Sequence, residues 1–277
     1  MKFKLKRRKK VKGVDFTKIL KGKKAMEHPT ALSYSSISLW CQCPAAWKAK
    51  YVDKLQAPVG DAARRGNAFD QLVASRLGCP LFDHLGKSID RPDESTELSD
   101  MLDGYFAFKD TWLDTRLERK PMAQVKVTVT PDQWAEMAGR YGANTKIPYS
   151  IIGFADLQRT MSDGVRIEGL DLKTSERMEF RSSWTYQILF YAAALGWSKS
   201  SIHLVVKNKS GVRVQGKSIL SGPNKPLIKH VLDWYAHYSN EIKNSLDNGG
   251  TEDWPRNHSY GCSWCPLMET CAVGQMK

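Results

Sequence analysis

The sequence predicts an α/β fold in which helices flank a mixed central sheet. Three observations carry this prediction. Residues 122–130 alternate between apolar and polar, as a strand does. Two further alternating segments, 149–161 and 165–175, are separated by a short loop with Asp163 and Gly164, a composition typical of a β-hairpin. A helical segment precedes these three strands, and a helix and another strand follow them, which gives the order helix, three strands, helix, strand.

Other elements follow from the periodicity on either side of this centre. A short helix is expected to begin near Ser35, and a second segment to follow Pro44. Further helices are expected over 60–78, 95–118, 182–197 and 225–246, and further strands over 201–209 and 212–220. The helix at 182–197 is apolar nearly all round, which predicts that it is buried.

The positive charge of the chain is concentrated at its N-terminus. Of the net charge of +13 at pH 7, residues 1–24 carry +11, because they hold twelve Lys or Arg residues and one acid, Asp15. We expect a disordered basic tail, since the segment has too few apolar residues to offset the entropy of ordering. A flexible cationic tail binds polyanions, which favours a nucleic acid as partner. Mitochondrial targeting fits less well, because the tail is rich in lysine and has no serine.

The chain has 277 residues, 42% of them hydrophobic, which is enough for one large domain or two small ones with a substantial core. We expect residues 25–277 to form a single domain. No run of about 18 apolar residues is present, so we expect no membrane-spanning helix and no membrane partner. The N-terminus has lysines but no apolar segment of signal-peptide length. These features predict an intracellular, cytoplasmic protein, or one in the host cytoplasm if its source is a virus.

The predicted hairpin brings two acids and a lysine together. Asp156 lies in its first strand, and Asp171 and Lys173 share one face of the second strand because side chains alternate with a period of two. Two carboxylates beside a lysine suit Mg²⁺ or Mn²⁺, which take hard oxygen ligands and accept phosphate oxygens in their remaining positions. Such a metal activates water and stabilises charge on a phosphate under attack, and a lysine can orient that water. A salt bridge on a solvated sheet face is the alternative interpretation of Asp171 and Lys173 taken alone.

These motifs resemble those of the PD-(D/E)xK nucleases. In "GFADLQ" followed by "LDLKTS", Asp156 matches the first acid of the family, and the sequence from Asp171 to Lys173 matches its D-x-K element. The predicted order of helices and strands also matches the core of that family. The resemblance implies a restriction-endonuclease-like core with a mixed central sheet, and catalytic roles for Asp156, Asp171 and Lys173.

Two further motifs are similar to those of the RecB-like branch of this family. The segment "YQILFY" places Gln187 and Tyr191 four residues apart on one helical face, like a Q-x-x-x-Y motif that helps to hold DNA. A packed helix with a polar edge is the alternative. In "RRGNAFD", Gly66 is followed four residues later by Asp70, where the branch usually has a histidine ligand. Aspartate is a competent hard ligand, so the resemblance implies that Asp70 joins Asp156 and Asp171 at the Mg²⁺ or Mn²⁺ site; a surface helix charge is the alternative.

Three cysteines near the C-terminus have the spacing of a metal centre. Cys262, Cys265 and Cys271 form a C-x2-C-x5-C run, which leaves a fourth ligand to find. The segment "YSSISLWCQCPAAWKAKY" resembles the opening of RecB-like nucleases with an iron-sulfur clasp, where the cysteine of a Cys-Pro pair is the first ligand.

That resemblance implies that Cys43 is the fourth ligand of a structural [4Fe-4S] cluster, with Cys41 in reserve. A tetrahedral zinc site fits the same four thiolates. Cys79 is interpreted as a small buried hydrophobic residue.

The resemblance as a whole implies a metal-dependent deoxyribonuclease, in first place a RecB-like exonuclease of DNA recombination, repair or replication. Its substrate would be single-stranded DNA or processed duplex ends, with recombination or replication proteins as candidate partners. One alternative is a nucleic-acid-binding subunit that kept the fold and lost catalysis. Another is a zinc-stabilised interaction protein in which the basic tail does most of the binding.

Overall fold

The structure is a computed structural model that describes residues 28–55, 59–81, 88–108, 121–161, 163–221, 224–248, 254–257, 262, 265, 267 and 271. The basic tail at residues 1–24 lies outside the described residues. The described helices are α1 (Tyr34–Gln42), α2 (Pro44–Tyr51), α3 (Asp61–Arg76), α4 (Thr96–Phe106), α5 (Pro131–Tyr141), α6 (Trp184–Leu195) and α7 (Lys225–Asp247). The described strands are β1 (Ala31–Ser33), β2 (Met122–Val129), β3 (Ser150–Thr160), β4 (Ile167–Ser175), β5 (Lys199–Asn208) and β6 (Gly211–Ser221).

The strands form one mixed sheet, as predicted. Its order is β1-β3-β4-β5-β6, and β2 pairs with β3 outside this path. The pairs β1·β3 and β4·β5 are parallel, whereas β2·β3, β3·β4 and β5·β6 are antiparallel. The β3·β4 pair confirms the hairpin predicted around Asp163 and Gly164.

The two strands of this hairpin separate after four residue pairs. Pairing between β3 and β4 runs from Thr160 and Ile167 to Leu157 and Leu170 and then stops. β2 covers the opposite edge of β3 along residues 151–158, so β1 and β4 must share the remaining edge. β1 pairs only with residues 150–152 of β3. Residues 153–156 therefore have no strand partner on this edge among the described residues.

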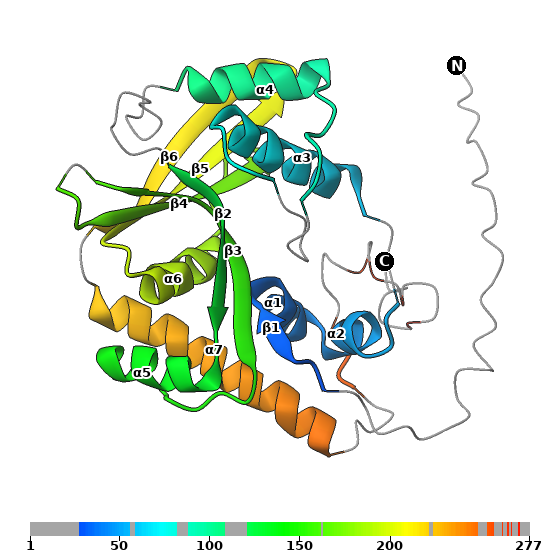
Figure 1. The fold of residues 1–277 in the computed structure, drawn as a ribbon. Coiled ribbons are helices and arrows are strands. Elements are labelled where there is room, and N and C mark those ends of the chain that lie inside the picture. The colour runs from blue at the N-terminus through cyan, green and yellow to red at the C-terminus, as the bar shows by residue number, and fades with distance from the viewer. Residues whose placement is uncertain are drawn as a thin grey trace, which may run out of the picture.

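Helices cover both faces of the sheet and enclose a core on each (Figure 1). On one face, α1, α2, α5, α6 and α7 pack over a large core whose most buried rings include Trp47, Trp134 and Tyr235. On the other face, α3 and α4 pack over a smaller core that contains Phe69 and Tyr105. The helix predicted over 182–197 is buried as expected, since six of its residues from Ile188 to Ala193 are inaccessible. None of the helices in the described ranges is both long and apolar enough to cross a membrane.

The structure corrects the predicted element order in two places. A helix, α5, lies between β2 and β3, so the three strands are not consecutive. Its signals are present in the sequence: Thr130 and Gln133 form a capping box, Pro131 occupies the first turn, and Gly142 ends the helix with a φ of 68°. The short strand β1 was also not predicted, because three residues are too few to show a period of two.

The helix predicted over 95–118 is shorter than expected. α4 ends at Phe106, where the Phe108 amide bonds the Tyr105 carbonyl in a tighter turn. Residues 109–120 lie outside the described part of the chain.

A close contact between Gly169 of β4 and Trp197, the second residue after α6, gives a test of this packing. A Cβ atom on Gly169 would lie 1.9 Å from the Trp197 ring, whose Nε1 donates a hydrogen bond to Gln158 Oε1 at 3.1 Å. Gly169→Ala should therefore lower the free energy of unfolding by about 1–3 kcal/mol, as overpacking does. Denaturant unfolding measures the change.

Gly139→Ala is the matched control. Gly139 is exposed on α5, and a Cβ atom added to it would have nothing within 4 Å, so alanine should raise stability by about 0.5–1 kcal/mol through higher helix propensity. Equal effects of the two substitutions would contradict the packing of Trp197 on β4.

Candidate active site

The two predicted acids lie where β3 and β4 separate. Asp156 comes immediately before Leu157, and Asp171 immediately after Leu170, the last pair of the hairpin. Beyond this pair the Leu172 amide has no backbone partner on β3, and Asp156 Oδ2 accepts its hydrogen bond at 2.7 Å. A buried N–H requires an acceptor, so this bond both completes the end of the hairpin and fixes the Asp156 carboxylate.

Asp171 and Lys173 form a close ion pair on one face of β4, as the alternation predicts. Lys173 Nζ lies 2.6 Å from Asp171 Oδ2. Asp171 is 1% exposed, and its Oδ1 accepts no hydrogen bond from any described residue. A buried carboxylate oxygen without a donor is costly, and a proton or a cation at this position would offset that cost.

Burial and neighbouring charges shift the pKa values of Asp156, Asp171 and Lys173. Burial and the neighbouring Asp171 carboxylate raise the pKa of Asp156 to about 7. Burial also raises the pKa of Asp171, although the Lys173 ammonium opposes the shift. For Lys173, burial alone would lower the pKa, but the carboxylates of Asp171 and Asp156 outweigh it and raise the pKa. The lysine is therefore charged at neutral pH. Its single positive charge does not offset the burial of both carboxylates, so the pKa values of the acids stay raised.

Asp70 reaches the same place from the other face of the sheet. Burial and the Asp156 carboxylate raise its pKa, and Lys173 and Asp171 also act on it, so the three acids and the lysine form one electrostatic cluster. A close approach of α3 to β4 makes this possible: a Cβ on Gly66 would lie 3.1 Å from Thr174 Oγ1. Gly66 thus has a packing role one helical turn before Asp70.

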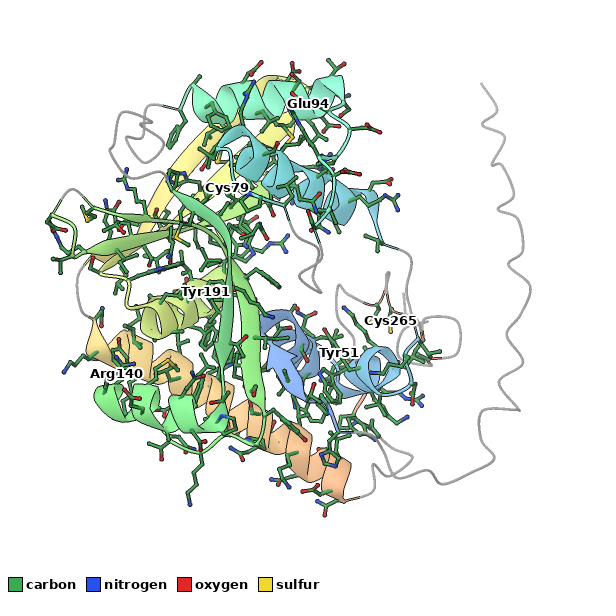
Figure 2. All side chains as sticks on the ribbon, in the orientation of Figure 1. Tyr51, Cys79, Glu94, Arg140, Tyr191 and Cys265 are labelled. Atoms are coloured by element: carbon green, nitrogen blue, oxygen red, sulfur yellow. The ribbon has the colours of Figure 1, made fainter. Side chains whose placement is uncertain are left out.

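Gln187 and Tyr191 of α6 join the cluster from the large core. Lys173 Nζ donates to Gln187 Oε1 at 3.4 Å, and Gln187 Nε2 donates to the Tyr191 hydroxyl at 3.1 Å. Tyr191, labelled in Figure 2, is only 3% exposed, so little of its ring is open to stack on a nucleotide. Its hydroxyl lies against β3, where a Cβ on Gly153 would be 2.5 Å away. The structure links Tyr191 to the acids through Gln187 and Lys173.

Tyr34 at the start of α1 was not singled out from the sequence. Its hydroxyl donates to the Ser183 carbonyl at 2.6 Å, and its ring lies 6.2 Å from that of Trp234. Burial raises the pKa of Tyr34, and the charges of Lys173 and Asp171 act on it as well. A tyrosine in an N-terminal helix carries no sequence signal of this proximity.

The C-terminal cysteines lie in one neighbourhood with Cys43. Cys265 lies close to α2 (Figure 2). Burial raises the pKa of its thiol, and the charges of Cys43, Cys262 and Cys271 raise this pKa further. Cys41 faces α7 instead, where burial raises its pKa to about 11 and its polar neighbours are Tyr238 and Glu241. Of the two N-terminal candidates, Cys43 is the one near the C-terminal run.

Cys79 lies apart from the other cysteines. It is half-buried at the smaller core, and its thiol faces the Pro121 carbonyl at 3.5 Å. This placement agrees with its interpretation as a packed apolar residue.

The side chains of the acidic cluster and of the cysteine cluster have the donor atoms that the expected metal ion and iron-sulfur cluster bind, although these side chains are not arranged as a metal site. Within the described residues, no group of three or more His, Cys, Asp or Glu side chains is arranged so that it could hold a metal ion. The donor types fit nonetheless. Asp70, Asp156 and Asp171 supply hard oxygens, including the buried Asp171 Oδ1 without a donor, which suits Mg²⁺ or Mn²⁺. Cys43, Cys262, Cys265 and Cys271 supply four thiols, which suit a soft metal or an iron-sulfur cluster.

Comparison with known proteins places these observations in a family. The mixed sheet flanked by helices fits a restriction-endonuclease-like core, and the model of the PD-(D/E)XK nuclease superfamily matches residues 31–272. The chain belongs to the PD-(D/E)XK nuclease superfamily, and this membership indicates a nuclease.

Two further comparisons add little. No curated protein matches the chain in sequence. A solved structure titled "Crystal structure of SSO0001" is similar with a TM-score of 0.43 and 10% identity, covering 90% of this chain and 88% of that chain. A similarity this low supports no conclusion about function.

The raised pKa of Asp156 predicts how pH affects the metal-free protein. Between the ordinary value of 3.8 and about 7, the folded protein keeps a proton that the unfolded chain has lost. Stability in EDTA should therefore fall as pH rises through this window and level off above it. Asp156→Asn should make this fall smaller, because only the raised pKa values of Asp70 and Asp171 then contribute to it, so that the variant is more stable than the wild type above pH 7. Denaturant unfolding of both proteins from pH 4.5 to 8 measures the difference, and parallel pH profiles would contradict it.

Proposed function

We propose that this protein is a metal-dependent DNA nuclease, and specifically a RecB-like exonuclease of DNA recombination, repair or replication. The observation that carries the proposal is the cluster of Asp156, Lys173 and the buried Asp171 at the end of the paired hairpin. Superfamily membership supports the hydrolytic activity. The finer assignment rests on Gln187 and Tyr191 beside the lysine and on the four neighbouring cysteines.

In this proposal Asp156 and Asp171 hold Mg²⁺ or Mn²⁺, and Asp70 completes or adjusts the coordination. The cation would supply Lewis-acid stabilisation of the phosphate and lower the pKa of a bound water. Lys173 stays charged because of the surrounding carboxylates. It therefore provides a fixed positive charge near the attacked phosphate and a donor that orients the attacking water.

Gln187 and Tyr191 act on Lys173 in the proposed mechanism. Gln187 Oε1 accepts from the ammonium group, and the Tyr191 hydroxyl accepts from the Gln187 amide. This chain fixes the direction of the lysine and leaves Tyr191 a positioning residue. Contact with the DNA strand falls to Gln187, which is only partly buried.

The cysteines have a structural role in the proposal. Cys43, Cys262, Cys265 and Cys271 would hold a [4Fe-4S] cluster, or a zinc ion with the same ligands, and join the N-terminal helices to the C-terminal segment. The basic tail would add salt-dependent affinity for DNA. Recombination or replication proteins are the proposed partners.

The central test replaces the acid and the lysine. Asp171→Asn and Lys173→Ala should each lower cleavage about 100-fold or more, because both act on charge that develops at the phosphate. Binding to DNA in EDTA should change little. End-labelled linear single- and double-stranded DNA and closed circular DNA, incubated with Mg²⁺, Mn²⁺ or EDTA, measure the activity. An exonuclease leaves the closed circles intact.

Asp132→Asn and Lys225→Ala are matched controls for this test. Both residues are exposed, at the first turns of α5 and α7, and their variants should cut at the wild-type rate. Wild-type cleavage by the Asp171 or Lys173 variant would refute the site. Rapid cutting of closed circles would leave a nuclease but refute the free-end requirement.

Tyr191→Phe separates positioning from stacking. The substitution keeps the buried ring and removes only the hydroxyl that accepts from Gln187 Nε2. We expect turnover to fall about 3- to 10-fold, the effect of one lost hydrogen bond, with little change in melting temperature or in DNA affinity. Single-turnover cleavage and thermal unfolding measure both quantities. Unchanged turnover would show that the hydroxyl does not serve Lys173.

A further inference from the structure

A cluster of three tryptophans joins the C-terminal segment to the N-terminal helices. Trp254 stacks on Trp47 of α2, with ring centroids 6.1 Å apart and an angle of 7° between the planes. It also meets Trp40 of α1 edge-on at 5.4 Å. Trp40 and Trp47 contact each other edge-on at the same distance. All three rings are buried, and Trp47 is 0% exposed.

Pro255, the residue after Trp254, provides a hydrogen-bond acceptor for the first turn of α2. The first amides of a helix have no partner within the helix. Cys43, the N-cap of α2, provides no side-chain hydrogen bond, and the Ala45 amide instead donates to the Pro255 carbonyl at 3.2 Å. The same carbonyl lies 3.9 Å from Cys43 Sγ. The segment therefore touches the proposed fourth cysteine ligand directly.

The segment leads from this contact toward the C-terminal cysteines. Cys262 Sγ lies 3.9 Å from the Asn257 carbonyl, two residues after Pro255. Trp254 is thus fixed to α1 and α2 only eight residues before Cys262. An anchor this close shortens the free chain that must be closed to bring a cysteine to Cys43, which raises the effective concentration of the thiols.

From these contacts we infer that Trp254 is a positioning residue that brings Cys262, Cys265 and Cys271 to Cys43 before any metal binds. The functional role of this contact rests on the proposed cysteine centre. The packing of Trp254 on α1 and α2 needs no metal. Ring stacking and burial hold the segment, and the hydrogen bond of Pro255 sets its direction. The Trp254 Nε1 atom has no hydrogen-bond partner among the described residues, so the ring contributes by packing and a phenylalanine can replace it.

Thiol cross-linking of the metal-free protein tests this inference. Dibromobimane joins two neighbouring thiols and becomes fluorescent, and peptide mapping identifies the linked pair. In wild type and in Trp254→Phe, we expect links between Cys43 and the C-terminal cysteines. In Trp254→Ala these links should fall at least about fivefold, because the segment loses its anchor. Links between Cys262 and Cys265 should persist, since these residues are three positions apart, and they serve as the internal control.

Tyr51→Ala is the matched control variant. Tyr51 of α2 also packs on Trp47, at 5.6 Å, so its loss perturbs the same ring without affecting the contact with Trp254. In Tyr51→Ala, the cross-links between Cys43 and the C-terminal cysteines should remain at the wild-type level. Circular dichroism checks that each variant is folded, and Trp254→Leu takes the place of Trp254→Ala if the latter does not fold.

The cross-linking tests the role of Trp254, and the metal content tests the proposed cysteine centre. Cross-links to Cys43 that are undiminished in Trp254→Ala would overturn the inference. Iron, sulfide and zinc contents of the purified wild type test the proposed centre instead. A protein that carries no metal but shows the expected cross-links would keep the role of Trp254 and reject the centre.

Discussion

The early end of the pairing between β3 and β4 is the constraint on which the site depends. Four residue pairs hold the hairpin, and then the strands separate. The separation leaves the Leu172 amide without a strand partner, and the Asp156 carboxylate takes that place. It also leaves a stretch of β3 edge open, so side chains from α6 and from α3 can reach the same carboxylates from opposite faces. A hairpin paired to its end would close this space with backbone hydrogen bonds.

Close approach of helices to strands completes the arrangement. Gly66 lets α3 lie against Thr174, and Gly153 lets the Tyr191 hydroxyl lie against β3. A Cβ atom at Gly153 would lie 2.5 Å from the Tyr191 hydroxyl and would force that side chain to shift, whereas one at Gly66 would lie 3.1 Å from Thr174 Oγ1 and would require a smaller adjustment. Either change would disturb the approach of Gln187 or Asp70 to Lys173. The geometry of the charged cluster is therefore set as much by missing side chains as by the charged residues themselves.

Much of this could be predicted from the sequence, because the hairpin and the acids have local signals. Alternation placed Asp171 and Lys173 on one face, and the Asp-Gly loop set Asp156 opposite them. The burial of Tyr191 agrees with the predicted burial of the helix at 182–197, but the contact of Gln187 with Lys173 could not be predicted, because it depends on how α6 packs against β4. Tyr34 was missed for a similar reason: its proximity to Lys173 depends on the packing of α1 against α6, which no short segment encodes. The helix α5 did have local signals in Thr130, Pro131 and Gly142.

The contact between Pro255 and the start of α2 also has a consequence for synthesis. It joins residues 212 positions apart in the chain. At about 5–20 residues per second, a ribosome needs roughly 10–40 s to make the intervening polypeptide. During that time the first turn of α2 lacks its acceptor, and Trp40 and Trp47 lack the ring that covers them. A nascent chain therefore exposes this apolar surface until Trp254 has been synthesised and has left the ribosome.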